Sequence, residues 1–414
     1  MPACGLDFGT SNSTLGVNLS DKVQMSQLEG HHSTIPSAMF YEDDGSVYYG
    51  RAAIQEFTDG MEGRLLRSLK SILGSDLMSQ KTQLAGRKIA FTDILCDFVK
   101  HLKQTAEQQS KTTLESVVLG RPVHFVDEDS QADKQAETTL RNIANQAGFK
   151  HIEFQYEPIA AAFAYEHTLA QEELTLIIDI GGGTADFSIV RVSPKRKLVA
   201  NRAEDVLANA GVHVGGTDFD KQLSLHSVMP HLGMGSLTTS GITFPTAPFF
   251  DLSTWHRIHG MYNTKYITQL RKLIKSSAVP DQTSRLLNIV EHQQGHRLLG
   301  KVEDAKIDLA QSQVTTLRLD FIENGLQIST TRNEFEDSIQ EELNKLSATV
   351  SVTLAQAGLQ PRDISAVFLT GGSTAIPAVK QATLQQFSHA KIIEGDRFGS
   401  VGYGLTLQAG RMFT

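Results

Sequence analysis

The stretch LTLIIDIGGGTADFSIV, at Leu174–Val190, decides the fold of this chain. Its apolar start leads to Asp179, three glycines and Thr184 follow, and Asp186 precedes a second β-rich run. Two apolar runs around a glycine-rich tight turn predict a β-hairpin.

The turn of this hairpin has the composition of a phosphate site. Gly181, Gly182 and Gly183 permit positive φ and leave backbone N–H groups uncovered, so the turn can wrap a polyanion. Asp179 and Asp186 would repel a phosphate unless a divalent cation lay between them, and Mg²⁺ prefers such oxygen ligands. The alternative interpretation is a plain hairpin with glycines at a bulge.

A second stretch, LDFGTSNSTLGV at Leu6–Val17, repeats the plan of the first. Asp7 again follows an apolar residue and precedes a small polar turn, which comprises Gly9, Thr10, Ser11 and Asn12. Two copies, one opening each half of the chain, predict a duplicated domain with two phosphate-binding hairpins that face each other.

The composition excludes several classes of function. A chain of 414 residues can bury a large core and form two or more domains. A net charge of −8 argues against a nucleic-acid partner, and no apolar run is long enough to predict a membrane span. The N-terminus does not have the pattern of a signal peptide, and the two cysteines form no disulfide framework, so we expect a cytoplasmic protein.

Two further side chains each have a functional and a structural interpretation. Lys70 lies among apolar residues and is either a snorkelling surface lysine or a lysine directed at the phosphate site. Glu157 stands at a predicted strand-to-helix junction, where open α/β sheets build their sites. The alternative is that Glu157 only complements the positive end of the helix dipole.

Strand and helix patterns alternate through the rest of the chain. The strands are expected at 35–41, 47–49, 116–123, 152–154 and 364–370, and the helices at 51–57, 91–109, 132–147, 158–165, 296–311 and 402–411. Thr331 and Glu334 form a capping box that opens one long helix ending at Gly358. The segment 229–284 has weak periodicity and is interpreted as an accessory subdomain, and His292 and His296 as surface histidines.

Two glycine pairs occupy positions where a ligand can approach the backbone. Residues 209–220 are expected to form a glycine-rich turn in which Gly215 and Gly216 open a helix, and the N-terminal N–H groups of this helix are expected to meet a phosphate. Gly371 and Gly372 follow the strand at 364–370, where they admit a flat ligand close to the main chain.

Taken together, these motifs resemble the actin-like ATPase superfamily, and most closely the nucleotide-binding domain of DnaK-type heat-shock chaperones. They run in family order across nearly the whole chain: LDFGTSNS (6–13), IPSAMFYEDDG (35–45), SLKSILG (68–74), YEPIAAAFAY (156–165), IIDIGGGTADFSIV (177–190), VGGTDFD (214–220), VEDAKIDLA (302–310), FLTGGSTAIPAV (368–379) and FGSVGYG (398–404).

The resemblance implies a two-lobed α/β fold made of duplicated ribonuclease-H-like domains. Lobe I is expected at residues 1–174, with an accessory subdomain at about 31–112. Lobe II is expected at residues 175–414, with an accessory subdomain at about 221–312.

The resemblance also implies a site for ATP or ADP with Mg²⁺. The family's metal shell matches Asp7 and Asp179 here, and its catalytic residues match Lys70, Glu157, Asp179, Thr184 and Asp186. The phosphate-binding positions match Gly9, Thr10, Ser11, Asn12, Gly181, Gly182, Gly183, Gly215 and Gly216. The nucleoside-binding positions match Glu303, Lys306, Gly371, Gly372 and Ser373.

Two departures from the family pattern concern the adenine. The family has arginines that clamp the base where Ile307 and Ala375 stand in this chain. The segment 221–302 is also longer than in those chaperones, and its aromatic residues are candidates for a substitute wall: Phe249, Phe250 and Trp255.

The chain ends at Thr414, where the ATPase domain of these chaperones ends, and in this it is similar to their shortened YegD-like relatives. The resemblance therefore implies a stand-alone ATPase domain with no peptide-binding domain in this chain. A partner protein or co-chaperone is implied but not identified.

Four functions follow from this resemblance. The first is a slow ATPase or ATP-driven chaperone-type switch that signals to a partner through lobe movement. The second is a nucleotide-sensing module with little hydrolysis, which the missing arginines favour. The third is a metabolite kinase of the same superfamily, and the fourth is a filament-forming actin-like role.

Overall fold

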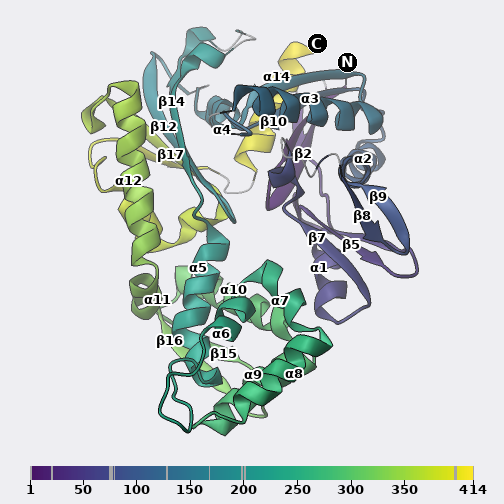
Figure 1. The fold of residues 1–414 in the computed structure, drawn as a ribbon. Helices are drawn as coiled ribbons and strands as arrows, with labels where there is room; N and C mark the ends of the chain where they lie inside the picture. The colour runs from purple at the N-terminus through teal and green to yellow at the C-terminus, as the bar shows by residue number, and fades with distance from the viewer. Residues whose placement is uncertain are drawn as a thin grey trace.

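A computed structural model describes residues 2–19, 22–73, 78, 80–126, 129–166, 168–196, 199, 202–395 and 399–413. Two large sheets lie side by side, with helices on their outer faces and two helices between them (Figure 1). Gly74 and Phe398, which belong to two of the family motifs, lie outside the described residues.

The sheet of lobe I has the strand order β11-β10-β1-β2-β3. Its strands are β1 (Ala3–Phe8), β2 (Asn12–Leu19), β3 (Lys22–Met25), β10 (Ser116–Arg121) and β11 (His151–Tyr156), and β4 (Thr34–Pro36) also pairs with β2. The hairpin β1–β2 is antiparallel, while β1, β10 and β11 are parallel to one another.

The sheet of lobe II repeats this topology strand for strand, in the order β18-β17-β12-β13-β14. Its strands are β12 (Glu173–Ile180), β13 (Ala185–Val192), β14 (Val206–Val212), β17 (Ala366–Thr370) and β18 (Lys391–Glu394). The hairpin β12–β13 is antiparallel, and β12, β17 and β18 are parallel. Both predicted hairpins and the predicted duplication are confirmed.

The helices follow the same repeat. Lobe I has α2 (Phe91–Ser110), α3 (Ser130–Gln146) and α4 (Glu157–Glu166), and lobe II has α12 (Gln340–Ala357), α13 (Pro377–Leu384) and α14 (Ser400–Met412). Helices α4 and α14 pack against each other in a core that both sheets share. Only glycine fits at residue 404 of α14, because a Cβ there would lie 1.9 Å from the carbonyl oxygen of Ala160 in α4.

Two smaller units extend from the lobes, that of lobe I on the right of the view in Figure 1 and that of lobe II at its lower end. The unit of lobe I contains β5 (Ala38–Glu42), β6 (Val47–Tyr49), α1 (Gly50–Thr58), β7 (Gly63–Arg67), η1 (Leu69–Ile72), β8 (Lys81–Leu84) and β9 (Arg87–Ala90). The unit of lobe II contains α6 (Ala247–Leu252), α7 (Trp255–Met261), α8 (Thr264–Ile274), α9 (Pro280–Glu291) and α10 (Gly295–Gln311). The exact bounds of the lobes and of these accessory subdomains stay predictions.

The remaining elements connect these parts of lobe II. The helices and strands are α5 (Gly216–Leu223), β15 (Val314–Arg318), β16 (Gln327–Thr331) and α11 (Arg332–Ser338). The short helical turns are η3 (Pro194–Arg196), η4 (Ala203–Asp205), η5 (Ser224–Val228), η6 (Met229–Leu232), η7 (Pro361–Asp363) and η8 (Gly372–Ala375). None of the described helices is both long and apolar enough to cross a membrane.

The structure corrects the long helix expected after Thr331. The capping box is present, with the Glu334 N–H donating to Thr331 Oγ1 at 3.2 Å and the Thr331 N–H donating to Glu334 Oε2 at 2.8 Å. The helix breaks at Ile339, however, which has φ −103° and ψ 15° and separates α11 from α12. Because Ile339 is fully buried in the core, packing overrides the continuous helical pattern.

Two other expectations are also corrected. His296 is only 5% exposed in α10, whereas His292 follows α9, so the two residues share no helix and His296 is not a surface histidine. The residues 209–212 belong to β14 instead of to a turn, because they continue the ladder with β13. Weak periodicity over 229–284 reflects short helices separated by turns, such as α6 with six residues and α7 with seven.

Candidate functional site

The turns of the two hairpins face each other between the lobes. A Cβ built at Gly182 in the β12–β13 turn would lie 2.3 Å from Ser11 Oγ in the β1–β2 turn. The first turn is itself tight, since a Cβ at Gly9 would lie 2.1 Å from the carbonyl oxygen of Asn12. Ser37 holds this turn from lobe I, because its hydroxyl donates to the Gly9 carbonyl at 2.7 Å.

Both turns present uncovered backbone donors. The Gly181 N–H donates to the Thr184 carbonyl at 2.9 Å and closes the second turn. Within the described part of the chain, other N–H groups of these turns have no acceptor: Thr10, Ser11, Gly182, Gly183 and Thr184. Uncovered N–H groups on two facing turns suit an extended anion.

The glycines of these turns allow close contacts between backbone segments and do not provide positive φ angles. None of Gly181, Gly182 and Gly183 adopts a positive φ, so the conformational freedom that the sequence suggested is not used. Instead, a Cβ at Gly215 would lie 2.5 Å from two backbone atoms of the β12–β13 turn, Gly182 C and Gly183 N. Glycine at residue 215 therefore allows α5 to pack directly against the turn.

The N-terminus of α5 holds this turn and is not available to a phosphate. The Gly216 N–H donates to the Gly181 carbonyl at 3.0 Å, and the Thr217 N–H donates to the Gly182 carbonyl at 2.7 Å. The Gly215 N–H donates to Asp218 Oδ2 at 2.9 Å. The expectation that these N–H groups meet a phosphate therefore fails, because the protein itself uses them.

Four carboxylates and one lysine gather beside the turns. Asp7 is the next-to-last residue of β1, Asp179 is the next-to-last residue of β12 and pairs with Asp186 of β13, and Glu157 starts α4. Lys70 Nζ lies 2.6 Å from Glu157 Oε1, and the lysine is only 8% exposed. A buried, paired lysine is not a snorkelling surface lysine, so the structure favours the functional interpretation of Lys70.

The balance of charge in this cluster shifts several pKa values. Burial, together with the charge of Glu157, raises the pKa of Asp7 to about 8. Burial and the neighbouring Asp186 raise the pKa of Asp179 to about 7. Burial alone would lower the pKa of Lys70, but Glu157 and Asp7 outweigh it and hold that pKa above its ordinary value. The site carries more negative charge than Lys70 neutralises.

This excess charge fits a divalent cation. Asp7 and Asp179 would hold Mg²⁺, which usually keeps several waters and takes one or two carboxylates. The part of the chain that the structure describes has no group of three or more His, Cys, Asp or Glu side chains arranged as a metal site. A Mg²⁺ held largely through water therefore agrees with the residues present.

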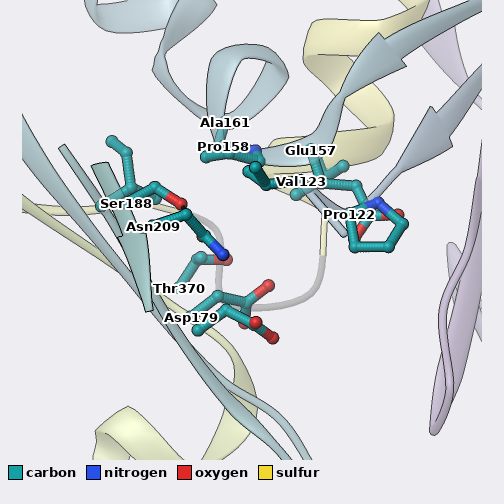
Figure 2. Close-up of a pocket in the computed structure, with 12 residues that line it drawn as sticks. Pro122, Val123, Glu157, Pro158, Ala161, Asp179, Ser188, Asn209 and Thr370 are labelled. Carbon is teal, nitrogen blue, oxygen red and sulfur yellow. Dashed lines mark hydrogen bonds between the residues drawn. The ribbon is translucent and has the colours of Figure 1, made fainter. Parts of the chain in front are cut away.

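A pocket opens beside the carboxylates, between Glu157 and Pro158 of lobe I and Asp179 and Thr370 of lobe II (Figure 2). The lining residues are Pro122, Val123, Glu157, Pro158, Ala161, Ile177, Asp179, Asp186, Ser188, Asn209, Thr370 and Val401. The sequence did not single out Ser188 or Asn209, which pair across β13 and β14 with a 2.7 Å hydrogen bond from the Ser188 hydroxyl. Asp186 and Ser188 are two residues apart on β13 and therefore lie on the same face of the sheet. The alternation of the sequence could thus have identified Ser188.

A row of side chains leads away from the turns along lobe II. Ser373 Oγ donates to the Gly181 carbonyl at 3.0 Å. Lys306 Nζ donates to the Gly216 carbonyl at 3.1 Å and to Asp220 at 2.9 Å. Glu303 lies one turn earlier on α10 and is exposed. Burial raises the pKa of Asp220 to about 6, although the Lys306 ammonium opposes this shift.

The glycine pair after β17 passes close to the carboxylates. Gly371 has φ +82°, and a Cβ there would lie 2.6 Å from Asp179 Oδ1. Gly372 begins the short turn η8, which contains Ala375. Ile307 on α10 is 55% exposed, so an apolar side chain is exposed at the position where the family pattern has an arginine.

Arg67 approaches this row from lobe I and was not predicted. Its guanidinium stacks over the Trp255 ring, with 4.6 Å between Cζ and the ring centroid. Phe249 is fully buried in the core and is excluded as a wall of the site, and Phe250 is 39% exposed beside Lys221. Of the three aromatic candidates, Trp255 alone meets a residue of the opposite lobe in the contacts described here.

Comparison with known proteins agrees with this geometry. The model of the Hsp70 protein family matches residues 3–231 and 282–412. The chain belongs to the Hsp70 family. The predicted actin-like, two-lobed Hsp70 fold is thereby confirmed, and the unmatched residues 232–281 fall in the accessory helices of lobe II.

The chaperone protein DnaK of Buchnera aphidicola subsp. Schizaphis graminum (strain Sg) is similar to this chain. The two are 25% identical over 435 residues, which cover 98% of this chain and 59% of that relative. The chain thus spans about 59% of the length of this Hsp70-type relative.

Proposed function

We propose that this chain is an ATP-binding Hsp70-family switch that hydrolyses ATP slowly with Mg²⁺ and signals to a partner protein through lobe closure. The observation that carries the proposal is the buried Lys70–Glu157 pair, at 2.6 Å, inside a cluster of four carboxylates. The uncovered N–H groups of the two facing turns add the means to hold a phosphate chain.

Each residue of the cluster has a distinct role in this proposal. Bound Mg²⁺ would neutralise charge on the phosphates and on Asp7 and Asp179. Lys70 would stabilise the charge that develops on the transferred phosphoryl group, because it stays protonated beside Glu157. Glu157 and Asp186 would order the attacking water, and Thr184 would position the phosphate from the turn.

Lobe closure follows from where the phosphate chain would bind. Ser11 belongs to lobe I and Gly182 to lobe II, and the two residues meet between the lobes. A ligand that binds both turns favours the closed arrangement over an open one, because only the closed arrangement offers both sets of donors. A partner protein or co-chaperone would sense this difference in closure.

The nucleotide-sensing module with little hydrolysis is the second candidate. It is favoured by the exposed Ile307 and by Ala375, which offer no positive charge to a base. The metabolite kinase and the filament-forming protein stay predictions without a structural observation in their favour.

Single-turnover hydrolysis distinguishes the first two candidates. Protein in excess over labelled ATP should release phosphate in the presence of Mg²⁺ and not after chelation. Lys70→Met should abolish release while ADP still binds. Lys103→Met is the matched control, since Lys103 is also 8% exposed and pairs with Glu107 at 2.7 Å, away from the carboxylate cluster.

Two outcomes count against the ATPase. Mg²⁺-dependent binding without any phosphate release from the unaltered chain would favour the sensing module. Equal phosphate release by Lys70→Met and Lys103→Met would remove Lys70 from the mechanism.

A further inference from the structure

Arg67 is a half-buried cation whose donors are unused. Among the described residues its guanidinium makes no hydrogen bond and no ion pair, and its contact is the stack over Trp255 at 4.6 Å. Burial lowers the pKa of Arg67, and the charges of Glu303 and Asp220 offset only part of this effect. A guanidinium carries five N–H donors, and since those of Arg67 bind no acceptor within the described part of the chain, they are available to a ligand.

The position of Arg67 is fixed by the chain on both sides. It is the last residue of β7, and Ser68 follows with φ 56°, a left-handed conformation that turns the chain into η1. Lys70, three residues later, reaches the carboxylate cluster. Arg67 and Lys70 therefore come from one short segment of lobe I and face two parts of the same site.

The contacts of lobe II place Arg67 beyond the phosphate-binding turns. The row from Gly181 through Ser373, Gly216 and Lys306 ends at Asp220, whose charge acts on Arg67. Gly181 of the β12–β13 turn lies at one end of this row, and Arg67, on which the charges of Glu303 and Asp220 act, lies near the other end. In a bound nucleotide, the base lies at the end opposite to the terminal phosphate.

We propose that Arg67 and Trp255 form the nucleobase-binding platform of this chain, with Arg67 supplied by lobe I and Trp255 by lobe II. This inference rests on the proposed nucleotide-binding function and names the residues that read the base. One face of the guanidinium packs on the indole, and the base stacks on the other face. Bases stack favourably on aromatic rings and on arginine planes, so the pair offers a flat, cationic surface.

The platform gives the base a role in lobe closure. Because Arg67 and Trp255 belong to different lobes, the base binds fully only when the lobes are closed. A ligand with a base should then favour closure more than the phosphate chain alone.

The competing interpretation is that Arg67 only fastens the lobes together. Phe57 of lobe I meets His296 of lobe II nearby, with 4.4 Å between ring centroids, and Trp255 lies 4.8 Å from the same histidine. A fastener would affect every ligand that needs closed lobes to the same degree. A base-binding residue would affect only ligands that carry a base.

The test uses this difference with two probes, ADP and inorganic tripolyphosphate, each with Mg²⁺. Calorimetry gives both affinities, and the emission of Trp255 reports on the platform directly, because it is the one tryptophan of the 414-residue chain. ADP should change the emission, and bound tripolyphosphate should change it less, because it carries no base to stack on the platform.

The variants are Arg67→Ala and the matched control Arg64→Ala. Arg64 lies on the same strand, is exposed, and donates to Thr82 Oγ1 away from the platform. Arg67→Ala should weaken ADP binding by roughly tenfold and leave tripolyphosphate binding unchanged. Arg64→Ala should change neither affinity.

Each remaining outcome has one meaning. If Arg67→Ala weakens the binding of ADP and of tripolyphosphate equally, Arg67 only holds the two lobes together, and the platform proposal is overturned. Unchanged ADP binding in Arg67→Ala would overturn it as well. If neither probe binds the unaltered chain, the proposed nucleotide-binding function fails, and the platform fails with it.

Discussion

Gly215→Ala is the substitution whose effect follows most directly from the geometry of the site. The added Cβ would lie 2.5 Å from Gly182 C and 2.5 Å from Gly183 N. Both are backbone atoms, so no side chain can rotate out of the way. The β12–β13 turn and α5 must separate by about 0.9 Å to restore an ordinary contact in a closely packed region.

This separation breaks the hydrogen bonds that hold the turn. The bond from the Gly216 N–H to the Gly181 carbonyl, now 3.0 Å, would pass beyond hydrogen-bond distance, and the 2.7 Å bond from Thr217 would be stretched. Losing both bonds costs about 1–3 kcal/mol of unfolding free energy. A displacement of this size at a binding turn should also weaken ADP binding by roughly tenfold to a hundredfold.

Urea unfolding and calorimetric titration with ADP and Mg²⁺ measure the two effects. Gly183→Ala is the control for stability, because a Cβ there meets nothing within 4 Å and Gly183 has no positive φ. Its unfolding free energy should stay close to that of the unaltered chain. The reasoning is refuted if Gly215→Ala unfolds and binds ADP like the unaltered chain.

Three further predictions concern packing, capping and pH. Gly404→Ala should destabilise the chain by about 1–3 kcal/mol or more in urea unfolding, because the new Cβ would lie 1.9 Å from the Ala160 carbonyl oxygen. Thr331→Ala should cost about 1 kcal/mol, since the Glu334 N–H loses its cap; an unchanged midpoint would count against the capping box. Burial lowers the pKa of His296 to about 4, below the ordinary value of 6.5, so the unfolded chain binds more protons between these values and stability falls as pH decreases through them. The unfolding free energy should fall by about 2 kcal/mol from pH 7 to pH 5 in the unaltered chain. This fall should disappear in His296→Gln, which keeps the neighbouring Arg67 and His259. An equal fall in both proteins would contradict the prediction.

The repeated core of the fold could be predicted from the sequence because its signals are local. Each glycine-rich turn lies between two apolar runs, and the two stretches at 6–17 and 174–190 share one pattern. Both hairpins and the duplication could therefore be predicted. The helix break at Ile339 could not be predicted from the sequence, because it depends on how α11 and α12 pack on the rest of lobe II.

The candidate site was predictable only where residues follow one another in the chain. Asp7 and Asp179 were found from their turns, and the resemblance supplied a role for Lys70 and Glu157, which are 87 residues apart. Arg67 was missed because its stacking partner, Trp255, lies in the other lobe, and no local pattern connects the two residues. The N-terminus of α5 was misjudged because its donors are used by a turn more than thirty residues earlier.

The most direct test of the central claim is calorimetric titration of the purified chain with ATP and ADP, with and without Mg²⁺. The account predicts one nucleotide per chain, with affinity that falls when Mg²⁺ is removed, because the carboxylates around Asp7 and Asp179 would then repel the phosphates. The absence of binding at millimolar nucleotide with Mg²⁺ would contradict the account, and the facing turns would then be a structural remnant of the Hsp70 fold.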